Sequence, residues 1–178
     1  IVTQPVGAMR IAGQSITFSV EATGTPLEYQ WRFNGLNIAG ANAATLELAS
    51  VEQSNAGAYA AYIKNPFGNI LSDAASLVVH YTLDVAGAGR GAVTHTPELV
   101  SYPNRARVVL NATPSKGYVF TGWSGAASGA ANPLAVTMDA NKSITGSFTR
   151  DVVPPEYRSV TINAAGQLEW VQVARLGK

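Results

Sequence analysis

The strongest constraint on the fold is the alternation of apolar and polar residues in many short segments. Residues 16–20 (ITFSV) and 29–33 (YQWRF) are clear examples. A side-chain period of two is that of a β-strand with one buried face. Clusters of Gly, Pro and Asn separate these segments at spacings of about 8–12 residues, which is typical of all-β domains. No window carries a sustained helical stripe, so the sequence predicts an all-β chain.

Composition excludes several functional classes. Only 13% of the 178 residues are charged and the formal net charge is +1, so we expect no nucleic-acid partner. There is no cysteine, which excludes thiolate chemistry, zinc–sulfur sites and disulfides. The apolar runs fall short of the roughly 20 residues of a membrane helix, so we expect no membrane insertion. No basic segment followed by an apolar one opens the chain, and any export signal is expected outside it.

Turn signals and composition divide the chain into three parts. The first covers residues 1–79 and includes Asn34-Gly35, a strong hairpin signal. The second covers residues 81–149 and follows with almost no linker. The third, residues 150–178, begins with the stiff spacer around Pro154-Pro155 and ends in an apparent hairpin. Since a single hairpin is marginally stable in water, we expect this part to open a truncated third β-module.

The first part resembles a bacterial immunoglobulin-like domain over residues 1–79. The residues that carry the resemblance are Gly13-Gln14-Ser15-Ile16-Thr17-Phe18, Tyr29-Gln30-Trp31, Leu46-Glu47-Leu48 and Asn55-Ala56-Gly57-Ala58-Tyr59. The resemblance implies that Trp31 is the buried strand-C tryptophan and that Tyr59 forms the tyrosine corner. Val20 and Ala61 then occupy the positions of the usual cysteine pair, so apolar packing replaces the cross-link. This sandwich hosts many unrelated functions.

The second part is similar to the divergent internalin-type B-repeat over residues 81–149. The residues that carry this similarity are Tyr81-Thr82-Leu83, Ala112-Thr113-Pro114, Gly117-Tyr118-Val119-Phe120-Thr121-Gly122-Trp123-Ser124-Gly125, Asn132-Pro133-Leu134, Met138-Asp139-Ala140-Asn141-Lys142-Ser143-Ile144-Thr145 and Phe148. The similarity implies a small β-rich, β-grasp-like repeat that serves as a stalk or adhesion element without a catalytic site. Residues 97–107 depart from the plainer turn of such repeats.

Two glycine-containing motifs could suggest enzyme chemistry. Residues 122–126 (GWSGA) nearly spell a nucleophile elbow, but the last glycine is missing and no helix pattern follows. Residues 87–91 (GAGRG) have strand signals on both sides, so a hairpin is favoured over a phosphate-binding loop. We therefore predict that the chain is not an enzyme, with no catalytic or cofactor-binding residue.

Metal binding is also disfavoured. His80 and His95 lack a third ligand at zinc-site spacing and are expected to be exposed residues of a linker and a loop. Asp139 and Asn141 could offer oxygens to Ca²⁺, but this ion prefers six to eight of them. An Asx-type turn capped by its own backbone is the favoured interpretation. We predict no metal site.

Aromatic residues are the remaining candidates for ligand contact. Tyr62 alternates with Tyr59 and is therefore expected to point outward from the first part. Tyr102 lies in an expected loop, and Trp170 lies in the C-terminal tail. Trp123 matches a packing position of the repeat, so a core position is favoured for it. It is still kept as a possible ligand-facing residue together with Tyr62, Tyr102 and Trp170.

The predicted function is that of a non-catalytic modular region of a bacterial secreted or cell-surface protein. It would act as a stalk, or spacer, and as an adhesion module, with an elongated shape. An alternative stays open, in which the chain is a carbohydrate-binding accessory region of an extracellular polysaccharide-degrading enzyme. The expected partners are neighbouring modules of the same chain, and a polysaccharide or another cell-surface ligand.

Overall fold

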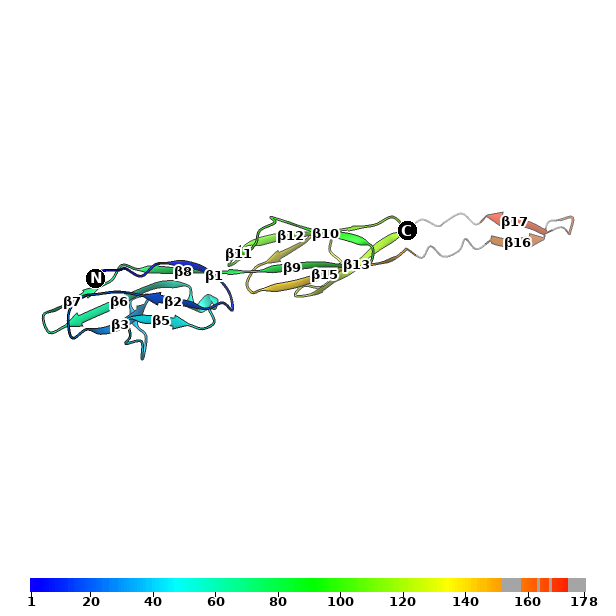
Figure 1. Ribbon diagram of the computed structural model, residues 1–178. Helices are drawn as coiled ribbons and strands as arrows, with labels where there is room; N and C mark the ends of the chain where they lie inside the picture. The colour runs from blue at the N-terminus through cyan, green and yellow to red at the C-terminus, as the bar shows by residue number, and fades with distance from the viewer. Residues whose placement is uncertain (152–157, 163, 167, 173–178) are drawn as a thin grey trace.

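The computed structural model describes residues 1–151, 158–162, 164–166 and 168–172. Two β-sandwiches lie end to end, and a separate hairpin follows them (Figure 1). Strands dominate throughout, and the described residues contain no α-helix, only one 3₁₀ turn at Gln53–Asn55. The predicted all-β class is confirmed.

The N-terminal sandwich consists of two facing sheets. The larger sheet has the order β1-β8-β6-β3-β4, with β7 paired to β6 and β11 paired to β8. The smaller sheet pairs β2 with β5. The bounds of these strands are Ala8–Ile11 (β1), Ile16–Ser19 (β2), Glu28–Phe33 (β3), Leu36–Asn37 (β4), Thr45–Leu48 (β5), Gly57–Asn65 (β6), Gly68–Leu71 (β7), Ala75–Tyr81 (β8) and Tyr102–Pro103 (β11).

Strand pairing in this sandwich has the features of an immunoglobulin-like fold. The N-terminal segment pairs with both sheets. Thr3 forms a β-bridge with Glu21, next to β2 of the smaller sheet, and β1 pairs in parallel with β8 of the larger sheet. The hairpin predicted at Asn34-Gly35 joins β3 to β4, and both residues have positive φ, as a type I′ turn requires. The topology confirms the predicted immunoglobulin-like β-sandwich.

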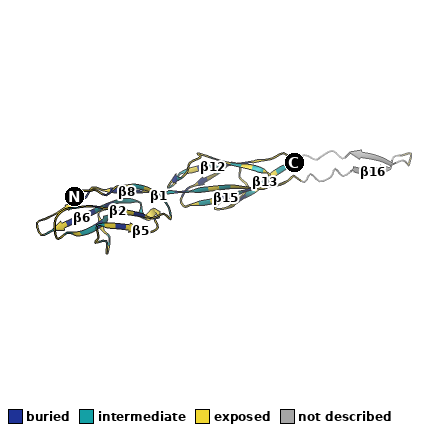
Figure 2. Ribbon diagram, in the orientation of Figure 1, coloured by how far each residue is buried: buried dark blue, intermediate teal, exposed yellow. Residues whose placement is uncertain are grey.

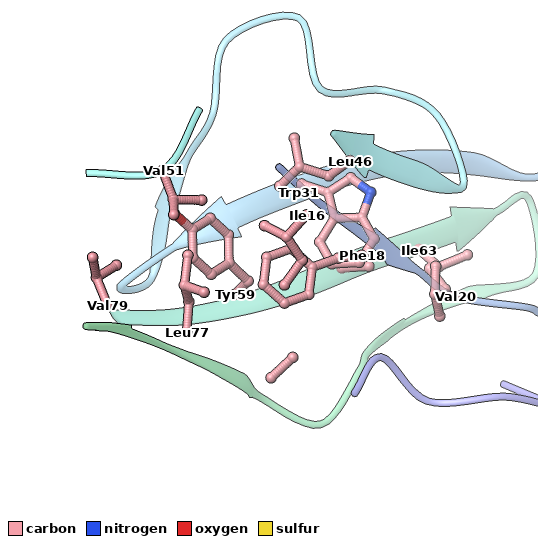
Figure 3. Packing of buried hydrophobic residues seen from close by; sticks show 12 residues of the cluster. Ile16, Phe18, Val20, Trp31, Leu46, Val51, Tyr59, Ile63, Leu77 and Val79 are labelled. Atoms are coloured by element: carbon pink, nitrogen blue, oxygen red, sulfur yellow. The ribbon is translucent and has the colours of Figure 1, made fainter. Parts of the chain in front are cut away.

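Three aromatic rings fill the centre of the first core. Trp31 is fully buried, and Phe18 lies between it and Tyr59, with ring centroids 6.2 and 4.7 Å away respectively (Figure 3). The indole Nε1 donates a hydrogen bond to the carbonyl of Ala43 at 3.0 Å. Val20 and Ala61 are buried at the positions of the usual cysteines, so packing alone closes this core.

Tyr59 also forms the predicted tyrosine corner. Its hydroxyl donates a 2.8 Å hydrogen bond to the carbonyl oxygen of Asn55, four residues upstream. Burial raises the pKa of this hydroxyl, so it remains a protonated donor at neutral pH. The bond fixes the turn that leads into β6.

The second sandwich consists of two three-stranded sheets that enclose a separate core. One sheet has the order β10-β12-β14, and the other has the order β13-β15-β9, in which β15 and β9 are parallel. The bounds are Leu83–Ala88 (β9), Gly91–Thr96 (β10), Arg107–Pro114 (β12), Tyr118–Gly125 (β13), Leu134–Thr137 (β14) and Lys142–Arg150 (β15). The expected small β-rich domain is confirmed, and its strands are divided between two three-stranded sheets around one core.

The glycine-rich segment at residues 87–91 is not a hairpin turn. It joins β9 to β10, which belong to different sheets, so the chain crosses from one layer to the other. A Cβ added to Gly91 would lie 2.5 Å from the ring of Phe148, and one added to Gly89 would collide with the backbone carbonyl of Phe148. The glycines therefore allow the crossing chain to pack directly against a core aromatic residue.

The C-terminal hairpin pairs β16 (Arg158–Ile162) with β17 (Leu168–Gln172) in antiparallel register. This confirms the predicted hairpin. The proline spacer at Pro154-Pro155 lies outside the described residues. Burial alternates along the strands of both sandwiches, as Figure 2 shows.

We expect the substitution Tyr59→Phe to lower the free energy of unfolding by about 1 kcal/mol, because the carbonyl of Asn55 loses its donor. Urea denaturation measures this change. Tyr29→Phe is the control, since it removes a hydroxyl from the neighbouring strand without touching the tyrosine corner. Equal stability of the two variants would contradict the role given to the Tyr59 bond.

We expect Gly91→Ala to destabilise the second sandwich by about 1–3 kcal/mol, because the added methyl group overpacks the Phe148 ring. Thermal denaturation followed by circular dichroism measures the loss. Gly68→Ala is the matched control, because a Cβ there has open space within 4 Å. An unchanged transition temperature for Gly91→Ala would show that the crossing chain does not pack as described.

Candidate functional site

Two of the four predicted ligand-facing aromatics are core residues. Tyr102 is fully buried, and its hydroxyl donates to the carbonyl of Pro97 at 2.8 Å. Trp123 is 4% exposed, and its indole nitrogen donates to the carbonyl of Ala131 at 2.7 Å. Neither ring has a face free for a ligand, so the ligand-facing prediction is wrong for Tyr102, whereas the core position favoured for Trp123 is confirmed. Trp170 lies in β17 opposite Val160, and its side chain lies outside what the structure describes.

Tyr62 lies on the outward face of β6, as the alternation with Tyr59 predicts. The side chain is half-buried, and the guanidinium carbon of Arg32 lies 4.7 Å from its ring centroid. This is cation–π geometry, in which the positive guanidinium is attracted to the electron-rich ring face. The structure thus places Tyr62 beneath a cation rather than leaving it as an isolated exposed ring. A ligand-binding role for Tyr62 stays a prediction.

The outward faces of β3 and β6 together form a shallow polar concavity. Glu28, Gln30 and Arg32 alternate outward along β3, opposite Lys64 and Tyr62 of β6. The concavity has a volume of about 640 Å³, and Asn37 and Asn42 contribute amide groups to its lining. We call it the β3–β6 concavity. The inward alternation of Tyr29, Trp31 and Phe33 in the sequence implies this outward set, since Gln30 and Arg32 lie between them.

Charge within the β3–β6 concavity is unbalanced. Lys64 Nζ lies 2.9 Å from a carboxylate oxygen of Glu28, and this hydrogen-bonded partner raises the pKa of Lys64. The Nε of Arg32 donates to the side-chain oxygen of Asn37 at 3.1 Å. Two cations therefore face one carboxylate at neutral pH, and the surface carries a net positive charge.

The second candidate site is the junction between the sandwiches. Only Thr82 separates β8 from β9. Strand β11 comes from the second part of the chain but pairs with the end of β8 in the larger sheet of the first sandwich, with Tyr102 opposite Tyr81. The hydroxyl of Tyr81 also reaches the side chain of Gln53 at 3.5 Å. The backbone hydrogen bonds between β11 and β8 therefore connect the two parts of the chain at the junction.

Asn141 links the two sandwiches with a single side chain. Its Nδ2 donates to the carbonyl of Ala12 at 3.0 Å, and its Oδ1 accepts from the backbone N–H of Thr82 at 2.9 Å. The prediction that an Asx-type turn is capped by its own backbone is therefore wrong for Asn141, whose amide bonds with residues distant in sequence. Asp139 instead pairs with Lys142 at 2.6 Å, and this hydrogen bond lowers the pKa of Asp139.

A small cavity of about 390 Å³ lies beside this junction. Its lining comes from both sandwiches and comprises Ala12, Glu52, Gln53, Ser54, Tyr81, Asp139, Ala140 and Asn141. Within the part of the chain that the structure describes, no three His, Asp or Glu side chains gather as a metal site would need. The acidic groups of the cavity are thus too few to suggest a bound cation.

The two histidines lie in strands rather than in exposed loops. His80 belongs to β8, and its Nδ1 lies 3.1 Å from the hydroxyl of Ser101. His95 belongs to β10, and its ring lies 6.4 Å from that of Tyr102. Both are half-buried, so the expectation of exposed linker and loop positions is wrong. Among the described residues no helix is long and apolar enough to span a membrane.

Comparison with solved structures finds multidomain chains, two of which are described as sets of immunoglobulin domains. Sidekick-1 immunoglobulin domains 1–5 are 16% identical over 97% of this chain, with a TM-score of 0.44. The insect immune protein hemolin is 11% identical over 89%, with a TM-score of 0.36. The N-terminal eight Ig domains of Down Syndrome Cell Adhesion Molecule are 14% identical over 91%, with a TM-score of 0.38. This chain spans 31%, 54% and 20% of those structures respectively.

Family comparison concerns the second sandwich. No curated protein matches the sequence. The model of the divergent InlB B-repeat domain matches residues 81–152, which confirms the similarity expected for that part of the chain. For the first part of the chain, the strand topology is the evidence for an immunoglobulin-like fold. The chain therefore has an immunoglobulin-like β-sandwich followed by a second sandwich whose residues 81–152 match the divergent InlB B-repeat domain.

Proposed function

We propose that the chain is a non-catalytic modular region of a bacterial secreted or cell-surface protein, acting as a stalk and adhesion module. In this proposal residues 1–79 form the sandwich module, residues 81–149 form the repeat, and residues 150–178 begin a further module. The match of residues 81–152 to a repeat family supports a modular role. The partners are neighbouring modules and a cell-surface ligand, and no catalytic, cofactor or metal site is assigned.

The observation that carries the proposal is the bonded junction between the two modules. Domains in one chain move relative to each other by default unless their interface holds them. Here the strand β8 continues up to Tyr81, a single residue follows, and Asn141 bonds to both Ala12 and Thr82. The backbone N–H of Lys142 also donates to the carbonyl of Thr82 at 2.9 Å. These bonds oppose bending at the junction, which is what a spacer requires.

The end-to-end arrangement of the modules also supports a spacer role (Figure 1). The two hydrophobic cores are separate, so neither sandwich needs to fold back onto the other for burial. A chain of this kind extends the distance between whatever is attached at its two ends. The alternative of a carbohydrate-binding accessory region is favoured by one observation, the cationic β3–β6 concavity around Tyr62.

We expect Asn141→Ala to loosen the junction while leaving both modules folded. Small-angle scattering should show a broader distribution of interatomic distances than for the unmodified chain, which itself should scatter as an elongated particle. Residual dipolar couplings give an alignment tensor for each module. In the variant the tensors of the two modules should agree less well, because the modules move more independently. Each lost hydrogen bond contributes about 1 kcal/mol, enough to change the population of bent forms.

Asn132→Ala is the matched control for this experiment. Asn132 also makes two backbone hydrogen bonds with its side chain, accepting from the N–H of Ala112 and donating to its carbonyl, but both lie within the repeat. This variant should lower the melting temperature without changing the relative orientation of the modules. A compact unmodified particle, or identical scattering from Asn141→Ala, would reject the spacer role.

A further inference from the structure

We propose that the β3–β6 concavity binds the carboxylate of an acidic polysaccharide, with Arg32 as the carboxylate-binding residue. This inference rests on the adhesive part of the proposed function and names the class of ligand. It does not depend on the rigidity of the junction.

Arg32 is held in place but keeps most of its donors. The ring of Tyr62 lies under its guanidinium, and its Nε donates to Asn37. No other hydrogen bond or ion pair of this guanidinium occurs among the described residues, so its terminal N–H groups are available. A guanidinium presents these donors in a planar fork that matches a carboxylate. Because the fork is already oriented, less side-chain entropy is lost on binding.

Charge in the concavity favours an anion. Glu28 is paired with Lys64, so this acid does not neutralise Arg32. The lysine remains protonated at neutral pH, because its hydrogen bond to Glu28 raises its pKa. An incoming carboxylate consequently meets a net positive surface.

The lining of the concavity favours a hydroxyl-rich ligand over a peptide. Peptide and protein interfaces depend on apolar anchors that fill buried pockets. Leu27 and Tyr29 also line this shallow concavity, but most of its lining is polar, with amide groups from Gln30, Asn37 and Asn42 beside the Tyr62 ring. The Gln30 amide nitrogen already donates to the carbonyls of Trp31 and Ile38, at 2.8 Å each, so it offers a ligand its acceptor oxygen. Such acceptors and donors suit sugar hydroxyls beside a uronate carboxylate.

The test is affinity electrophoresis of the full chain through gels that contain polygalacturonate, carboxyl-reduced polygalacturonate or poly-L-glutamate. We expect retardation by polygalacturonate alone, and we expect it to weaken as salt is added. Arg32→Gln should weaken binding by roughly tenfold or more, the scale of a lost bidentate contact. Arg32→Lys should lose most of the affinity as well, because it keeps the charge but not the fork.

Arg90→Gln is the matched control, since it removes the same charge from an exposed position on the other sandwich. It should leave retardation unchanged. The proposal is overturned if polygalacturonate causes no retardation, if the carboxyl-reduced polymer is bound equally, or if Arg32→Gln binds as well as Arg90→Gln. Equal, Arg32-dependent binding of poly-L-glutamate would also overturn it and would assign an acidic peptide instead. None of these outcomes affects the scattering test of the spacer role, which uses Asn141.

Discussion

Strand β8 is the element on which both sandwiches depend. Ala75, Leu77 and Val79 point into the first core, and Tyr81, two residues further along the same face, is buried in the second. One alternating strand thus supplies side chains to two separate hydrophobic clusters. Its backbone pairs with β1 and β6 in the first sandwich and with β11 at its end. Because the side-chain period is two, a one-residue slip in β8 would disrupt both cores together.

Much of the first sandwich could be predicted because its signals are local. Alternation placed Trp31 and Phe18 inside, and the Asn34-Gly35 pair fixed a hairpin through its backbone preferences. The second sandwich was less accessible to the same reasoning. Tyr102 lies in a two-residue strand that carries no periodicity, and its burial depends on pairing with Tyr81. The glycines at residues 87–91 looked like a hairpin because alternation cannot show which sheet a strand joins.

The contacts of the candidate sites could not be predicted, because they join residues that are far apart in the sequence. The outward direction of Tyr62 follows from alternation, but its contact with Arg32 depends on the register of β3 against β6. The sequence around Asn141 predicts a turn, but its partner Ala12 is 129 positions away in the sequence. Local patterns give the face of a strand on which a residue lies. They do not give the distant group with which a polar side chain forms its bonds.

The parallel pairing of β1 with β8 has a mechanical consequence for a chain pulled from its ends. Residues Ala8–Ile11 run beside 77–80 in the same direction, so the chain enters this sandwich at the end opposite to its exit (Figure 1). Tension therefore acts along the two strands and slides them past each other. The hydrogen bonds between them run across the pulling direction, and they share the force instead of opening one after another. Strand direction thus sets the geometry in which a pulling force would load the bonds between β1 and β8 together.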